Sequence, residues 1–105
     1  MDITVSGKHI EVTPAIREYA ESKVAKLPRY YDRVSKIDVL ADSSNHTDGG
    51  VEVEIIVHVE KSAPFVVKIE SNDLYACIDD AVDNLERRLT QHKDKKRNRK
   101  HSAPK

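Results

Sequence analysis

The side chains of this sequence best suited to bind a charged ligand are the lysines and arginines of RRLTQHKDKKRNRK, residues 87–100. Ammonium and guanidinium groups bind phosphate oxygens, so a run of this kind is typical of a surface that binds nucleic acid. The whole chain is neutral, with 18 basic and 18 acidic residues, but its charge is divided. Residues 1–86 hold nine basic and seventeen acidic residues, whereas residues 87–105 hold nine basic and one acidic residue.

A second basic region lies earlier in the chain, between residues 17 and 36, where acidic neighbours are few. Its members are Arg17, Lys23, Lys26, Arg29, Arg33 and Lys36. Acidic sequence separates the two basic regions, so the fold must bring them together before they can form one binding surface.

The other reactive side chains show no comparable pattern. Cys77 is the one cysteine, so no internal disulfide can form, and its place near an apolar stripe predicts a buried, unreactive thiol. The five histidines lack metal-ligand spacing, and Asp79, Asp80 and Asp83 fall on the polar face of a predicted helix. With three glycines and no glycine-rich phosphate loop, we expect no enzyme, no cofactor and no metal.

A chain of 105 residues is long enough for one hydrophobic core and too short for two ordinary domains. Its N-terminus, MDITVSGKHIEV, lacks the long apolar segment of a signal peptide, and no stretch approaches the length needed to span a bilayer. We therefore expect a cytoplasmic location.

The N-terminal third predicts a strand followed by a helix. Ile3, Val5, Ile10 and Val12 alternate weakly over the first twelve residues, with Gly7 expected at a bulge or bend. Thr13-Pro14 then gives a helix start, because threonine caps free amides and proline suits the first helical position. The helix should span residues 13–27, where an apolar stripe ends before Pro28.

Three further strands are expected over residues 34–41, 51–60 and 65–70, forming an antiparallel meander. In VEVEIIVHVE the odd-numbered valines and Ile55 should face the core, while Glu52, Glu54 and Glu60 face the other side. A second helix begins at Ser71-Asn72-Asp73 and should end near His92, with its apolar stripe facing the sheet.

These elements predict an α+β fold: a β-α-β-β-β-α two-layer sandwich, with a four-stranded sheet and both helices on one face, like a double-stranded RNA-binding domain. Residues 1–92 would form the domain, and residues 93–105 a basic, flexible tail. Because the uncovered sheet face carries glutamates, nucleic acid should meet the helices instead. Lys23 and Lys26 lie beside the apolar stripe of the first predicted helix, and a ridge of polar and basic residues lies beside the apolar stripe of the second. If these two flanks adjoin, the helices share a basic cleft. The ridge consists of Asn84, Arg88, Gln91 and Lys95.

Each of these features also has an ordinary structural explanation. Arg87, Arg88 and Lys93 lie near the expected end of a helix, where positive charge offsets the helix dipole. Tyr30 and Tyr31 could stack on bases, but a paired aromatic just after a helix more often closes the edge of a core.

Two segments carry a resemblance to a known family. EVTPAIREYAESKVAKLPRYYDR (11–33) and DLYACIDDAVDNLERRLTQHKDK (73–95) resemble, in residue order and spacing, the two helix motifs of the ribosome hibernation promoting factor family. This family is also called the ribosome-associated inhibitor or sigma-54 modulation protein family. The likeness runs from residue 1 to about residue 95.

The resemblance implies a β-α-β-β-β-α domain that binds the small ribosomal subunit in the channel for messenger RNA and transfer RNA. By occupying that channel, the family excludes translation substrates during stress or stationary phase. Matching positions make the following residues candidates for contact with 16S rRNA: Lys23, Lys26, Arg29, Arg33, Arg87, Arg88, Lys93, Lys95 and Lys96.

The sequence also departs from parts of the family. Longer members have a C-terminal domain that pairs ribosomes, and this sequence stops before one could form. The ribosome-associated inhibitor branch often carries an acidic extension, whereas KDKKRNRKHSAPK (93–105) is basic. The resemblance therefore favours the short hibernation-factor branch, whose members cooperate with a separate ribosome modulation factor to form inactive ribosome dimers. Away from the ribosome, a monomer is expected.

The sequence leaves two alternatives open. The chain could be a general double-stranded RNA-binding protein, although such domains place lysines at the start of the last helix, where this chain has Ser71-Asn72-Asp73. It could also be a protein-interaction module that modulates transcription. Binding that survives nuclease and high salt would favour that module, because a contact dominated by phosphate weakens steeply with salt.

Overall fold

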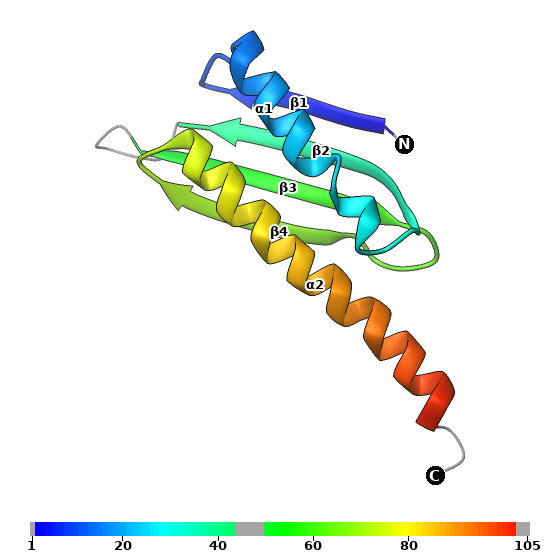
Figure 1. Cartoon of the computed structure of the whole chain (residues 1–105). Coiled ribbons are helices and arrows are strands. Elements are labelled where there is room, and N and C mark those ends of the chain that lie inside the picture. The colour runs from blue at the N-terminus through cyan, green and yellow to red at the C-terminus, as the bar shows by residue number, and fades with distance from the viewer. Residues whose placement is uncertain (1, 44–49, 103–105) are drawn as a thin grey trace.

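The computed structural model describes residues 2–43 and 50–102, with side chains described up to residue 95. The elements follow the predicted order. They are β1 (Asp2–Lys8), α1 (Pro14–Val24), the 3₁₀ helix η1 (Leu27–Arg29), β2 (Val34–Asp42), β3 (Val51–Val59), β4 (Phe65–Ser71) and α2 (Leu74–Ser102). Figure 1 shows α1 and α2 side by side on the same face of the sheet. The predicted two-layer α+β fold is confirmed.

The sheet has the strand order β1-β2-β3-β4. β2, β3 and β4 pair antiparallel and form the predicted meander, whereas β1 pairs with β2 in parallel. The parallel pairing follows from α1, because a chain that leaves β1 must cross the sheet face before it can return in the same direction. As a result α1 lies over the β1 side of the sheet and α2 over the β3–β4 side (Figure 1).

The strand pattern of β3 positions the core. Its odd-numbered residues are buried and its even-numbered residues are partly exposed, as the alternation predicted. The buried residues pack against the apolar stripes of both helices, which include Ala20, Val24, Ile78, Leu85 and Leu89. The polar flanks of the helices are left facing solvent, where they can meet a partner.

The first strand is shorter than expected. β1 ends at Lys8, and His9 turns the chain with a φ of 60°. Gly7 forms no bulge, since it pairs in regular register with Ala41. A Cβ atom at Gly7 would lie 2.4 Å from the carbonyl oxygen of Ile10, so the glycine leaves room for the returning chain.

α1 begins as predicted, with the Thr13 hydroxyl accepting a hydrogen bond of 3.2 Å from the Ile16 amide. Its α-helical part ends at Val24 rather than at residue 27, and η1 completes the run through Pro28. A proline is tolerated only in the first turn of a helix. Pro28 therefore lies in the separate short helix η1 and not in a continuation of α1.

α2 begins at Leu74, where the Asp73 carboxylate accepts a hydrogen bond of 3.0 Å from the Tyr75 amide. The helix was expected to end near His92 and instead continues to Ser102, beyond the end of the sheet (Figure 1). Residues 74–102 contain no glycine or proline, and lysine and arginine are good helix formers. No change of secondary structure therefore marks the expected domain boundary between residues 92 and 93. No helix in the described part of the chain is long and apolar enough to cross a membrane.

Candidate nucleic-acid interface

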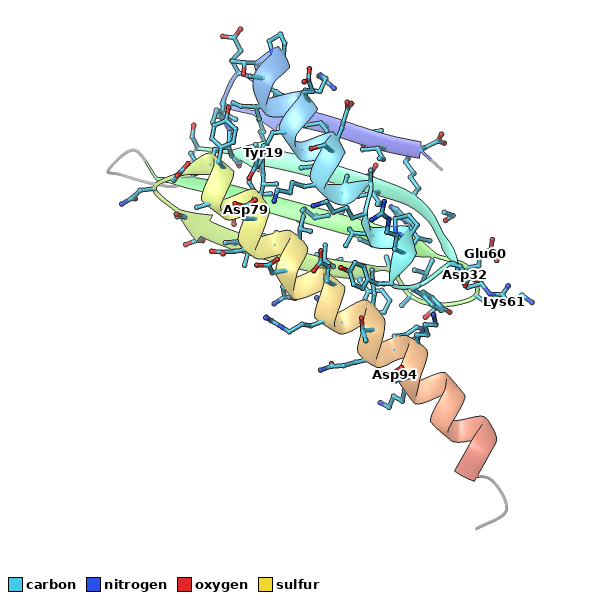
Figure 2. The ribbon with its side chains drawn as sticks, in the orientation of Figure 1. Tyr19, Asp32, Glu60, Lys61, Asp79 and Asp94 are labelled. Carbon is cyan, nitrogen blue, oxygen red and sulfur yellow. The ribbon has the colours of Figure 1, made fainter. Side chains whose placement is uncertain are left out.

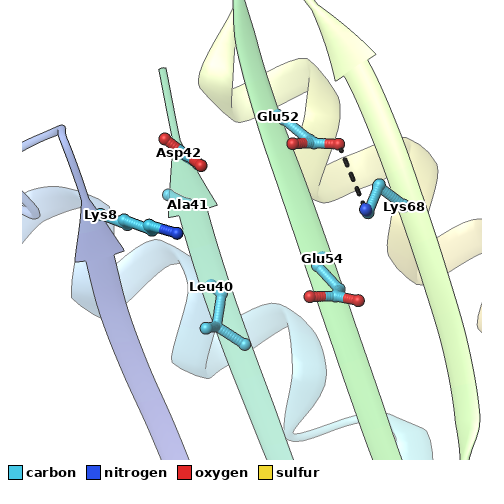
Figure 3. Close-up of a pocket in the computed structure, with 7 residues that line it drawn as sticks. All are labelled: Lys8, Leu40, Ala41, Asp42, Glu52, Glu54 and Lys68. Carbon is cyan, nitrogen blue, oxygen red and sulfur yellow. Dashed lines mark ion pairs between the residues drawn. The ribbon is translucent and has the colours of Figure 1, made fainter. Parts of the chain in front are cut away.

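The uncovered face of the sheet is anionic. Alternation along the four strands places six carboxylates and three lysines on it. They are Asp2, Asp38, Asp42, Glu52, Glu54 and Glu70, with Lys8, Lys36 and Lys68. Figure 3 shows the part of this face around Glu52, whose carboxylate pairs with Lys68 at 3.7 Å. Phosphate is disfavoured here, which leaves the helical layer for a polyanion.

A polar cluster of three side chains, Tyr19, Lys23 and Asp79, joins α1 to α2. The Tyr19 hydroxyl donates a hydrogen bond of 2.5 Å to Oδ1 of Asp79, and the Lys23 ammonium lies 3.3 Å from the same oxygen. Figure 2 shows Tyr19 on α1 next to Asp79 on α2. The Tyr19 ring also packs edge-on against Tyr75, with centroids 4.9 Å apart. These contacts fix which flanks of the two helices face each other.

The cluster keeps its charges fixed at neutral pH. The hydrogen bond from Tyr19 lowers the pKa of Asp79, and Lys23 and Lys26 lower it further. Asp79 in turn raises the pKa of Lys23, first through the hydrogen bond and then through its charge. The contact between the two helices therefore places an ionised carboxylate beside the predicted Lys23.

The remaining candidates between α1 and β2 lie on the surface. Lys26 and Arg29 are exposed, and neither forms an ion pair within the described side chains. Arg33 lies 3.4 Å from Glu60, and more than half of each side chain is exposed to solvent. An exposed pair of this kind is weak, so Arg33 remains available to an anion.

The candidates on α2 are spread around the helix. Arg87, Lys93 and Lys95 are exposed and form no ion pair in the part of the chain with described side chains. Lys96 lies within α2, but its side chain is outside the described set.

Arg88 lies on the side of α2 that faces β4. Its Nη1 donates a hydrogen bond of 2.7 Å to the carbonyl of Val66, and its guanidinium lies 5.5 Å from the centroid of the Phe65 ring. Arg88, Gln91 and Lys95 border a hollow of about 410 Å³ together with Phe65 and His92.

The condition for a shared basic cleft, that this ridge adjoins Lys23 and Lys26, is not met, because Asp79 and Tyr75, not Arg88, face α1. The helical wheel correctly placed the ridge next to the apolar stripe of α2. It could not show on which side of that stripe α1 packs. The candidate cations therefore cover the helical layer on both sides of α2 rather than lining one cleft.

Cys77 and Tyr31, for which the sequence favoured a structural role, both lie in the core. Cys77 is fully buried, and burial raises the pKa of its thiol. Tyr31 is buried and packs edge-on against His92, with centroids 5.0 Å apart, as expected for a core edge. Among the described residues, no three His, Cys, Asp or Glu side chains gather closely enough to hold a metal ion.

Sequence reasoning missed Tyr19, Asp79 and Phe65 as parts of the helical surface. Asp79 was expected to be solvated, and its contact with Tyr19 joins residues 60 positions apart, which helical periodicity cannot predict. A signal for Phe65 was its place as the first residue of an edge strand, beside a predicted basic ridge.

A sheet with carboxylates on its bare face, covered on the other face by two helices that carry the candidate cations, defines a small two-layer α+β domain. Comparison with known proteins agrees with this class and makes it specific. The chain belongs to the sigma 54 modulation protein / S30EA ribosomal protein family, whose model matches residues 3–97.

Individual relatives are similar over almost the whole chain. The ribosome hibernation promoting factor of Escherichia coli (strain K12) is 35% identical, with 90% of this chain and 96% of the relative covered. Among solved structures, the N-terminal domain of Protein Y from Thermus thermophilus has a TM-score of 0.76 at 35% identity, covering 88% of this chain and 99% of that one. A ribosomal subunit interface protein from Coxiella burnetii has a TM-score of 0.78 at 26% identity, covering 90% and 99%.

Proposed function

We propose that this chain is a cytoplasmic ribosome hibernation factor. It binds 16S rRNA of the small ribosomal subunit in the channel for messenger RNA and transfer RNA, and it inhibits translation by occlusion during stress or stationary phase. Family membership and relatives named ribosome hibernation promoting factor support this role. Inhibition by occlusion requires only that the chain bind in the channel and fill it, so no residue is assigned a catalytic step.

One observation carries the proposal beyond family membership. Five of the exposed candidate cations on the helical layer form neither an ion pair nor a hydrogen bond within the described side chains, while the opposite face is anionic. The five are Lys26, Arg29, Arg87, Lys93 and Lys95. Cations without internal partners keep their full attraction for phosphate, because binding RNA breaks no contact inside the protein.

The proposal extends to partners and to the basic C-terminal segment. The chain is a monomer away from the ribosome and binds both the small subunit and the 70S ribosome. With a separate ribosome modulation factor, it favours inactive ribosome dimers. Residues 93–105, with seven basic residues and one acidic residue, add phosphate contacts next to the domain of residues 1–92.

A charge reversal tests the proposal. In the variant Lys26→Glu with Arg87→Glu, both changes fall on exposed residues, so folding should be preserved. The variant should lose sedimentation with 30S and 70S particles, and its inhibition of in vitro translation should fall at least about tenfold, since two phosphate contacts are replaced by repulsion.

The matched control makes the same charge change on the sheet face, as Lys8→Glu with Lys68→Glu. Its inhibition should stay within about twofold of wild type, because that face does not meet RNA. Full inhibition by a folded Lys26/Arg87 variant, or equal loss in the control, would refute the proposed face. Equal affinity of the wild type for free RNA duplexes and for ribosomes would instead support the general RNA-binding alternative.

A further inference from the structure

The β4 side of α2 carries an arginine whose position is fixed by its neighbours. Arg88 is exposed, yet its Nη1 is tied to the Val66 carbonyl at 2.7 Å and its guanidinium lies over the Phe65 ring at 5.5 Å. The Phe65 ring is held in turn by His92, which packs edge-on with centroids 5.2 Å apart. An arginine side chain normally loses much conformational freedom on binding, and here part of that loss has already occurred on folding.

The fixed guanidinium borders a hollow with mixed chemistry. The hollow is open to solvent and has a volume of about 410 Å³. Lys95 adds a second cation to its lining, and Gln91 adds an amide that can both donate and accept hydrogen bonds. The Arg88 guanidinium can stack on the face of a base, the Lys95 ammonium can bind a phosphate, and the Gln91 amide can bind the edge of a base. Together they match the parts of one nucleotide.

Paired RNA would not use this arrangement. In a duplex the base faces are stacked and hidden, whereas an unpaired base can lie on a guanidinium plane or an aromatic ring. The side chains of Lys26 and Arg29, at the two ends of η1, offer phosphate contacts without such a platform, since neither has a described aromatic partner.

We propose that Arg88, held by Phe65 and the Val66 carbonyl, is a stacking platform for one unpaired ribonucleotide of an RNA strand, whose phosphate is bound by Lys95. The inference rests on the proposed function and deepens it, because it distinguishes an unpaired segment of rRNA from duplex backbone as the ligand at this flank. It also separates Arg88 from the other cations, which contribute charge alone.

The test compares two labelled strands by fluorescence anisotropy: a mixed-sequence RNA hexanucleotide and a strand of equal length made of abasic spacers. The wild-type chain should bind the base-bearing strand at least about fivefold more tightly, since one base stack changes affinity by about 5- to 150-fold. In Arg88→Lys, which keeps the charge but loses the plane, this ratio should fall below about twofold.

Arg17→Lys is the matched control, because Arg17 is an exposed arginine on α1 outside the hollow, and its ratio should equal that of wild type. Phe65→Leu, checked for folding by circular dichroism, should lower the ratio in the same way as Arg88→Lys. Equal binding of both strands by wild type, or an unchanged ratio in Arg88→Lys, would overturn the platform. Displacement of the hexanucleotide by an equal nucleotide concentration of adenosine monophosphate would overturn its assignment to an RNA strand.

In vitro translation separates this inference from the proposed function. If wild type inhibits translation but shows no base preference, the platform fails and the hibernation role stands. If wild type binds no 30S particles but keeps an Arg88-dependent base preference, the hibernation role fails and the platform stands.

Discussion

At the scale of single residues, Asp79 is an unexpected feature of the helical surface. A carboxylate works against phosphate on the surface proposed to bind RNA, yet Asp79 holds Lys23 at 3.3 Å and accepts a hydrogen bond from Tyr19. Its role is therefore to join α1 to α2 at the position where both helices must present their cations. Lys23 is the one candidate on α1 whose ammonium must leave an internal partner to bind phosphate fully.

Replacing this carboxylate gives a test with a defined pH dependence. Asp79→Asn should lower the midpoint of thermal unfolding at pH 7 by less than about 5 °C, because exposed ion pairs are weak. The pKa of Asp79 is lower in the folded chain, so the contact stabilises fully above the unfolded-state pKa of about 3.9. Its effect is lost as pH falls through the lower folded-state pKa. Thermal scans by circular dichroism at several pH values would follow this.

The control for that experiment is Asp83→Asn, which removes an exposed carboxylate with no described contact to α1. Its unfolding midpoint should match wild type at every pH. A difference between Asp79→Asn and wild type that grows below pH 4 would have the wrong sign for the proposed contact.

At the scale of elements, the sequence predicted what local rules govern. Thr13 capped α1, the alternation in β3 placed its odd-numbered residues inside, and Leu74 began α2 next to Asp73, because each of these depends on neighbours within a few residues. The turn at His9 and the length of α2 were missed. Ile10 and Val12 kept a strand-like pattern after a positive φ had already reversed the chain. The end of α2 was placed where its apolar stripe stops, although no residue there breaks a helix.

The close packing of the turn after β1 against Gly7 predicts a loss of stability when that residue gains a side chain. Gly7→Ala should lower the free energy of unfolding by about 1–3 kcal/mol, because the new methyl group would meet the Ile10 carbonyl at 2.4 Å and a Val12 methyl at 2.8 Å. Urea denaturation of the variant would measure the change. Ser6→Ala, one residue earlier and exposed, should differ from wild type by less than about 0.5 kcal/mol. Equal stability of the two variants would show that the chain does not need this close approach.

The candidate site was only partly predictable. The sequence showed which lysines and arginines could bind phosphate, and the family resemblance indicated which of them are candidates for contact with rRNA. The neighbours of each cation depend on how helices 50 or more residues apart pack, which no local pattern contains. Arg88 illustrates this limit, because its wheel position was right while its packing partner, β4 rather than α1, could not be deduced.

At the scale of the whole molecule, the division of charge predicts strong salt dependence despite a net charge of zero. If the five unpaired cations each neutralise a phosphate, the slope of log affinity against log salt should be about −3.5 to −4.5. Affinity for 30S subunits would then fall roughly 100- to 500-fold between 50 and 200 mM salt. Sedimentation or anisotropy titrations across that range would measure the slope.

A single substitution calibrates that slope. Lys26→Ala should make it shallower by about 0.7–0.9, the value for one lost contact. Binding that does not change with salt would contradict an interface dominated by phosphate and would favour a protein partner.

The charge distribution also governs the encounter that precedes binding. A neutral molecule about 55 Å long, with an anionic body and a cationic helix that extends past the sheet, has a large electric dipole moment and no net monopole. A dipole experiences mainly a torque in the field of a polyanion, and at physiological salt that field fades within about 8 Å. Such a molecule is not drawn from afar to every nucleic acid in the cell. It is turned, over the last few ångströms, so that the projecting end of α2 arrives first.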